Sequence, residues 1–165
     1  MSYLDALIEK HAPKAWDGHC NEAGLAIIKR FEGWSSSVYQ CSAGRWTIGW
    51  GSTWDYDGNP VTADHPNIKK DKGEYLLRRE IRHSETAVRK LIKAELTPNM
   101  FSSLVSFCYN VGSGNLQRSS LRMKANRGNY EGAADEFPKW RRAGGRILKG
   151  LVRRRASERQ LFLSE

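Results

Sequence analysis

Residues 31–53, FEGWSSSVYQCSAGRWTIGWGST, decide the fold. In the second half of this stretch, bulky apolar residues alternate with other residues at the two-residue period of a β-strand: Trp46, Ile48 and Trp50 against Arg45, Thr47 and Gly49. The run Ser42-Ala43-Gly44, which precedes the alternation, has the composition of a turn. We therefore expect a β-hairpin within residues 36–52.

Elsewhere the apolar residues follow the 3.6-residue period of helices. Upstream of the hairpin, Leu25, Ile28 and Glu32 share one face of a helix that we expect over residues 22–32, with Gly33 as its end. Downstream, the same period predicts helices over residues 71–94, 97–112, 119–127, 129–137 and 150–163. The fold class that follows is α+β and mainly helical.

Two helix starts carry recognisable capping residues. Asp71 and Glu74 have the spacing of a capping box, and Thr97-Pro98 is an N-cap followed by proline at the first helical position. We expect residues 1–21 to be an N-terminal extension with a short amphipathic helix at 3–11. The catalytic domain would then span 22–165, with a small α+β lobe (22–70), a connecting helix (71–95) and a helical lobe (96–165).

Composition limits the class of protein. Hydrophobic residues make up 39% of the 165 residues and charged residues 27%, which suits a folded core rather than a disordered chain. No run approaches 18 apolar residues, and the N-terminus lacks the pattern of a signal peptide or signal-anchor, so we expect a protein made in the cytoplasm. Cys20, Cys41 and Cys108 are too scattered for a disulfide scaffold or a zinc site.

Positive charge is concentrated in the second part of the chain. Residues 1–70 contain seven Lys or Arg and eight Asp or Glu, whereas residues 71–165 contain 20 and 10. Arg141-Arg142 and Arg153-Arg154-Arg155 are the strongest clusters, and a solvated helix face is the common explanation of such runs. The charge indicates an anionic partner: nucleic acid, a membrane surface or a cell wall.

Glu32 is the most informative candidate for chemistry. It shares a face with two core residues and lies at a helix C-terminus, where the dipole disfavours negative charge. Both effects raise the pKa of a carboxyl group, as a general acid at neutral pH requires. A side chain turned to water at a fraying helix end is the equally simple alternative.

Cys41 and Thr47 flank the predicted turn. A three-residue loop would place them directly opposite each other, and a two-residue loop diagonally. Taken alone, a strand Thr and a small buried Cys need no functional explanation. The aromatic residues of this lobe could stack on sugars or bases, or could form the core of a small sheet, as is at least as reasonable for Trp46 and Trp50.

The 31–53 stretch resembles the catalytic segment of phage-type lysozymes, glycoside hydrolase family 24, in which Glu, eight residues, Asp or Cys, five residues and Thr precede Ile-Gly. The segments LTPNMFSSLVSFCYNVGSG (96–114) and FPKWRRAGGRILKGLVRRRASERQLFL (137–163) are similar to helical-lobe segments of the same family. The resemblance covers residues 22–163 in order. It implies a lysozyme-like fold, in which a small β-hairpin lobe is joined by a long helix to a helical lobe.

The resemblance also implies hydrolysis of the β-1,4 bond between N-acetylmuramic acid and N-acetylglucosamine in peptidoglycan. Glu32 would protonate the leaving oxygen. Cys41 could be a weak base, a nucleophile, or a group that orients water with Thr47; we favour orientation or base, because a thiol is largely protonated at pH 7 and a nearby carboxylate would raise its pKa. Candidate substrate-binding residues are Trp34, Tyr39, Trp50 and Asn110. No metal or organic cofactor is implied.

The family further implies an endolysin that waits in the host cytoplasm until a holin permeabilises the inner membrane and then acts on the cell wall. We expect a monomer whose basic C-terminal half attaches to anionic wall or outer-membrane surfaces, with no nucleic-acid partner. The alternatives are a virion-associated lysozyme used at cell entry and, from a different class, a basic nucleic-acid-binding protein.

Overall fold

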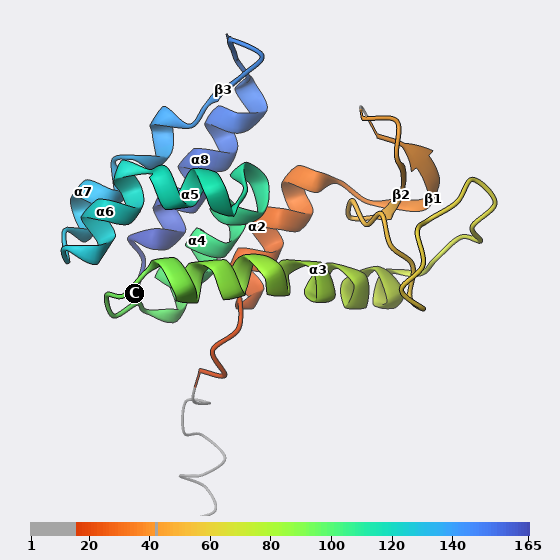
Figure 1. Cartoon of the computed structure of the whole chain (residues 1–165), viewed down its shortest axis with the longest axis horizontal. Coiled ribbons are helices and arrows are strands. Elements are labelled where there is room, and N and C mark those ends of the chain that lie inside the picture. Colours follow the sequence, from red (N-terminus) through yellow and green to blue (C-terminus); the bar gives the residue numbers. More distant parts are fainter. Residues whose placement is uncertain (1–15, 42) are drawn as a thin grey trace, which may run out of the picture.

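The computed structural model describes residues 16–41 and 43–165. The small lobe contains strands β1 (Ser35–Gln40) and β2 (Trp46–Gly49), which follow helix α2 (Glu22–Glu32). Helix α3 (Lys70–Leu91) leads from this lobe into the helical lobe. The helical lobe then contains α4 (Pro98–Val111), α5 (Ser113–Arg118), α6 (Ser120–Asn126), α7 (Tyr130–Ala134), η1 (Phe137–Lys139), strands β3 (Arg142–Ala143) and β4 (Arg146–Ile147), and α8 (Lys149–Phe162). Figure 1 shows the two lobes at opposite ends of α3.

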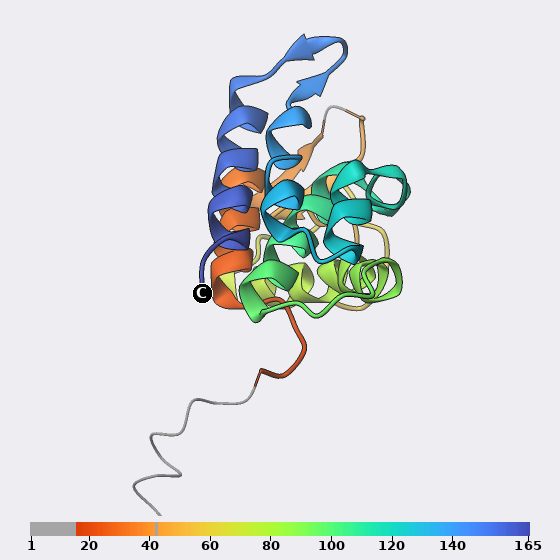
Figure 2. The same ribbon diagram turned by 90° about the vertical axis from the view of Figure 1, so that its left-hand side faces the viewer.

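Helices α2, α4 and α8 pack against one another and position the site. The apolar face of α4 is fully buried at Leu104, Val105 and Phe107. From α2, Leu25 and Ile28 enter the same core. Figure 2 shows α2 and α8 along one side of the helical lobe, which explains how residues at the two ends of the described chain meet.

Helix α3 belongs to two cores. Leu77, Ile81 and Val88 lie in the core of the helical lobe, whereas Leu76 packs in a smaller cluster with Ile48, Val61 and Ile68 under the β-hairpin. Helix α3 therefore contributes side chains to the cores of both lobes.

The start of α3 differs from the prediction. Lys69 is the N-cap and makes no side-chain hydrogen bond there, so the capping box of Asp71 and Glu74 was wrong. Glu74 instead pairs with Lys29 of α2 and with Arg78, whose Nε lies 3.1 Å from Glu74 Oε1. The carboxylate is engaged by one cation of the neighbouring helix, Lys29, and by one cation a turn further along its own helix, Arg78.

Most other boundaries agree with the predictions, although α3 ends at Leu91 rather than at 94 and α7 at Ala134 rather than at 137. The hairpin falls within 36–52 apart from Ser35, α2 has the predicted bounds, and Thr97 caps α4 by accepting a hydrogen bond from Met100 N at 3.1 Å. The prediction missed α5, the short helix η1 and the β3–β4 hairpin. The helix predicted at 3–11 lies outside the described residues. Within those residues, no helix has the length and apolarity needed to cross a membrane.

Residues immediately before α2 are attached to the helical lobe. The side chain of Glu85, almost fully buried on α3, accepts hydrogen bonds from the backbone N–H of Cys20 at 2.8 Å and faces His19 Nδ1 at 3.0 Å. The N–H of Asn21 donates to Ser102 Oγ on α4 at 2.9 Å. These contacts fix the origin of α2 and therefore the position of its far end.

Candidate active site

Glu32 is the last residue of α2 and lines an open pocket formed by α2, α4 and the beginning of α8. Gly33 ends the helix with φ of 75°, a conformation that favours glycine, and its N–H donates to Lys29 O at 3.1 Å. The Glu32 side chain is 26% exposed, so it is partly desolvated, as its helix face predicts. A pocket of about 310 Å³ surrounds it, lined also by Phe31, Asn110, Leu148, Gly150, Leu151 and Arg154.

Arg154 of α8 holds the Glu32 carboxylate. Its Nη1 donates to Glu32 Oε1 at 2.7 Å, while only 3% of the arginine side chain is exposed. The same guanidinium donates from Nε to Glu158 Oε1 at 3.2 Å and from Nη2 to the carbonyl of Ser106 at 3.3 Å. Because three acceptors surround the planar guanidinium group, its orientation is fixed, and the guanidinium in turn fixes the position of the Glu32 carboxylate.

A second arginine completes the buried charge network. Arg155 and Glu158 are both fully buried, with Arg155 Nε 2.9 Å from Glu158 Oε2. Burial lowers the pKa of Arg155 to about 10 and raises that of Glu158. Ser106 Oγ donates to Glu158 Oε1 at 2.7 Å. Two cations thus balance the two carboxylates, Glu32 and Glu158, in a region that admits little water.

This network corrects the expectation of an exposed arginine run. Arg153 is exposed, but Arg154 and Arg155 are buried and paired, so the 153–155 cluster is not a solvated face. Sequence reasoning missed both residues as members of the site. Their only signal was Glu158, spaced four and three residues from them on one helix.

Asn110 faces the pocket and is oriented by Arg155. Its Oδ1 accepts a hydrogen bond from Arg155 Nη2 at 2.9 Å, and that guanidinium also lies 4.9 Å from the centroid of the Phe107 ring. The amide NH₂ of Asn110 is left available to the pocket side. A substrate acceptor group could use it, as the sequence-based assignment requires.

The register of the β-hairpin places Tyr39, and not Cys41, opposite Thr47. Tyr39 pairs with Thr47, Gln40 with Trp46, and the N–H of Cys41 donates to Arg45 O at 3.0 Å. Three residues lie between Cys41 and Arg45. With a loop of this length, Cys41 and Thr47 are diagonal neighbours. The prediction that a three-residue loop would place them directly opposite each other was wrong.

The Cys41 thiol is nevertheless in a polar environment that includes Thr47. Its pKa is lowered, first by backbone hydrogen bonds from Arg45 and Ala43. The expectation that a nearby carboxylate would raise this pKa was wrong, because these donors stabilise the thiolate. Thr47 itself is buried, and its Oγ1 donates to Arg45 O at 3.0 Å.

The predicted aromatic residues divide into two groups. Trp34 and Trp50 pack on each other with centroids 4.5 Å apart, and Trp50 is only 8% exposed, so these rings contribute to the core beside Gly73. Tyr39 is 37% exposed. Its pKa is raised by partial burial and then by the charge of Glu32, so the tyrosine lies within electrostatic reach of that carboxylate.

Sequence reasoning also missed Tyr109 and Glu80 beside the cleft. Tyr109 Oη donates to Glu80 Oε2 at 3.4 Å, and the pKa of Tyr109 is raised by burial and by the charges of Glu80 and Glu32. Burial raises the pKa of Glu80, which lies on α3 near Ser52. A Cβ added at Gly51 would lie 3.8 Å from Glu32 Oε2, so the proposed acid faces the end of β2.

A partly buried carboxylic acid at the end of α2, followed directly by a β-hairpin that carries Cys41 and Thr47, is the arrangement expected of a lysozyme-type glycoside hydrolase. The family model of phage lysozymes matches residues 29–158. The chain belongs to the phage lysozyme family, which confirms the resemblance seen in the three sequence segments and the predicted fold class.

Individual relatives agree with this assignment. The chain is 40% identical to an endolysin of Bacillus phage B103 over 87% of its length, and 39% identical to an endolysin of Acyrthosiphon pisum secondary endosymbiont phage 1 over 88%. It spans 54% of the first relative and 99% of the second. A crystal structure of a P22 lysozyme mutant matches with a TM-score of 0.81 and 34% identity, covering 88% of this chain and 99% of that one.

Proposed function

We propose that this protein is an endolysin that hydrolyses the β-1,4 bond between N-acetylmuramic acid and N-acetylglucosamine in bacterial peptidoglycan. The observation that carries the proposal is Glu32, partly buried in the lining of an open pocket and held by Arg154. The family match supports the same substrate class.

In this proposal Glu32 is the general acid. The carboxyl must bind its proton before each turnover and deliver it to the glycosidic oxygen as the bond breaks. Arg154 occupies Oε1, which leaves Oε2, the atom nearer Gly51, as the oxygen directed toward a substrate in the cleft. The ion pair therefore orients the acid.

Cys41 and Thr47 act on the opposite side of the sugar. The lowered pKa of the Cys41 thiol supports a role as the weak base, with Thr47 of the same hairpin orienting the water. Water attacking from the face opposite Glu32 inverts the anomeric carbon, and the proton lost by that water passes to the sulfur. Tyr39 and Asn110 flank the cleft as substrate contacts, and Trp34 and Trp50 support the β-hairpin behind it.

The attachment of the enzyme to its substrate is proposed to be electrostatic. Residues 137–157 contain eight Lys or Arg and no Asp or Glu, and every residue from 141 to 150 is exposed on or beside the β3–β4 hairpin. Burial of Arg154 and Arg155 removes the strongest cluster available to a nucleic-acid-binding protein, and favours the wall as the anionic partner.

The remaining expectations complete the proposal: a monomer with the lobes at residues 22–70 and 96–165, joined by the connecting helix of 71–95, that depends on a holin for passage from host cytoplasm to wall. Relatives named SAR-endolysin, such as that of Enterobacteria phage P21, also match the chain. For that reason the route to the wall is tested separately, by expressing the chain in bacteria with and without a holin.

Incubation with purified peptidoglycan tests the activity. New reducing ends should appear with the wild-type chain and not with Glu32→Gln. Release of peptides without new reducing ends would show that the enzyme cuts a different bond.

A further inference from the structure

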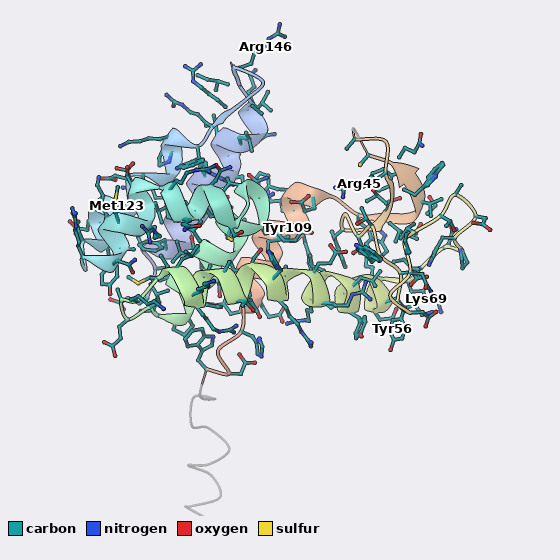
Figure 3. All side chains as sticks on the ribbon, viewed as in Figure 1. Arg45, Tyr56, Lys69, Tyr109, Met123 and Arg146 are labelled. Carbon is teal, nitrogen blue, oxygen red and sulfur yellow. The ribbon has the colours of Figure 1, made fainter. Side chains whose placement is uncertain are left out.

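A second groove lies on the small lobe, apart from the Glu32 pocket, and none of its lining residues belongs to that pocket. It has a volume of about 260 Å³ and lies between the loop of residues 55–57, the segment 65–68 and the first turns of α3. In Figure 3, Tyr56 lies at this edge of the small lobe. Tyr109, whose pKa is raised in part by the charge of Glu32, lies near the middle of the molecule.

One exposed aromatic ring, that of Tyr56, lines this groove, and two further exposed rings lie near it in the structure or the sequence. Tyr56 and Tyr75 are 52% and 46% exposed, yet their rings lie against each other with centroids 4.6 Å apart and an interplanar angle of 37°. Trp54, two residues before Tyr56, is 50% exposed. Large rings left open to water on a small lobe are unusual enough to indicate a binding surface.

The loop that carries Tyr56 is held in one conformation. Asp55 Oδ1 accepts a hydrogen bond from the N–H of Asn59 at 2.8 Å. Arg79 of α3 donates from Nη1 to the Asp55 carbonyl at 2.7 Å and from Nη2 to the Trp54 carbonyl at 3.1 Å. A ring supported in this way loses little conformational entropy when a ligand covers it.

The composition of the groove matches that of a sugar-binding site. Ile68 and Leu76, both buried, lie beneath it, and Tyr56 supplies an aromatic wall. Asp57, Asn67 and Lys72 supply both hydrogen-bond acceptors and donors around the opening. A pyranose ring has the complementary character, with apolar C–H faces and a rim of hydroxyl and acetamido groups.

We propose that this groove is a second glycan-binding site, which holds an N-acetylhexosamine segment of the wall while Glu32 acts on another segment. The inference rests on the proposed peptidoglycan substrate. Binding at two places on one polymer converts the second contact into an intramolecular one, and this raises the time spent on the wall. A short oligomer cannot reach both places, so it gains nothing from the second site.

Two double variants test this site through the ratio of the initial rate on insoluble walls to the rate on a short soluble glycan oligomer. Tyr56→Ala with Tyr75→Ala should lower this ratio at least fivefold. Tyr56→Phe with Tyr75→Phe keeps both rings and should keep the ratio within twofold of wild type. Met123→Ala removes an exposed apolar side chain at the far end of the molecule and serves as the matched control (Figure 3).

Direct binding is measured by NMR on the full chain carrying Glu32→Gln, titrated with tetra-N-acetylchitotetraose. Amide shifts should appear at residues 55–57 and 65–68, and should vanish when both tyrosines are alanine. An unchanged rate ratio together with no shifts at these residues would overturn the proposal. A wild-type chain inactive on both substrates would instead refute the proposed function, while the NMR titration would still report on the groove.

Discussion

Replacement of Arg154 by methionine probes the buried charge network most directly. Methionine keeps much of the side-chain length and apolar stem but removes the donors to Glu32, Glu158 and the Ser106 carbonyl. Removal of one partner from a buried ion pair costs about 3–5 kcal/mol. Because Glu158 keeps Arg155 and Ser106 as partners, we expect a loss of about 3 kcal/mol, at the lower end of this range.

That loss has a measurable size in a chain of this length. Each kcal/mol corresponds to about 2–4 °C in Tm for proteins of 150–250 residues, so calorimetry should show a fall of about 6–12 °C. Wall hydrolysis should fall by about 100-fold below the melting temperature, because Glu32 loses the contact that fixes its position.

Arg153→Met is the matched control, since this neighbour is exposed and should change stability by about 0.5 kcal/mol or less. The reasoning is refuted if Arg154→Met melts within about 2 °C of wild type, less than 1 kcal/mol on this scale. Full activity at reduced stability would show that the pair holds the fold but does not position the acid.

Four further outcomes follow from the site. Glu32→Gln should abolish reducing-end release with little loss of fold, and Thr47→Ala should reduce it less; a tenth or more of the wild-type rate in Glu32→Gln would place the general acid elsewhere. Cys41→Asp should remain active and the first product should have inverted configuration by NMR, whereas retention with an inactive Cys41→Asp would favour a sulfur nucleophile. Burial raises the pKa of Glu80, so its contribution to stability is full below the unfolded value of about 4.3 and is lost as pH rises through the folded value. Glu80→Gln should therefore match wild type in a thermal melt near pH 4 and exceed it near pH 8, and an equal difference at both pH values would contradict this. Wall binding should weaken as salt rises above physiological strength, since exposed charges are screened over about 8–10 Å, and binding that is indifferent to salt would remove the electrostatic role of the basic region.

Helices and strands were predicted correctly where the residues that determine them lie close together in the sequence. Helices α2 and α4 follow from apolar spacing, Thr97 and the terminal glycines, all within a few residues of one another. The β3–β4 hairpin was missed because each strand has two residues, too few to show a period, although Gly144 and Gly145 both adopt the positive φ that a tight two-residue turn needs.

The site was predictable where motif spacing sufficed and not where tertiary pairing decides. Glu32 and Cys41 could be selected from the family pattern. The burial of Arg154 could not, because an arginine run has the same appearance in a solvated helix as in one that faces another carboxylate. The diagonal placement of Cys41 and Thr47 likewise depends on a hairpin register that the spacing alone did not fix.

The ion pair between Glu32 and Arg154 joins residues 122 positions apart in the chain. A growing polypeptide on the ribosome presents Glu32 long before α8 exists, and during that interval the glutamate has no guanidinium to orient it. A chain cleaved between the β-hairpin and α8 also lacks the guanidinium partner of Glu32 once α8 dissociates. If Glu32 is the acid and Arg154 orients it, as proposed, competence for hydrolysis is acquired late in synthesis, when the final helix docks.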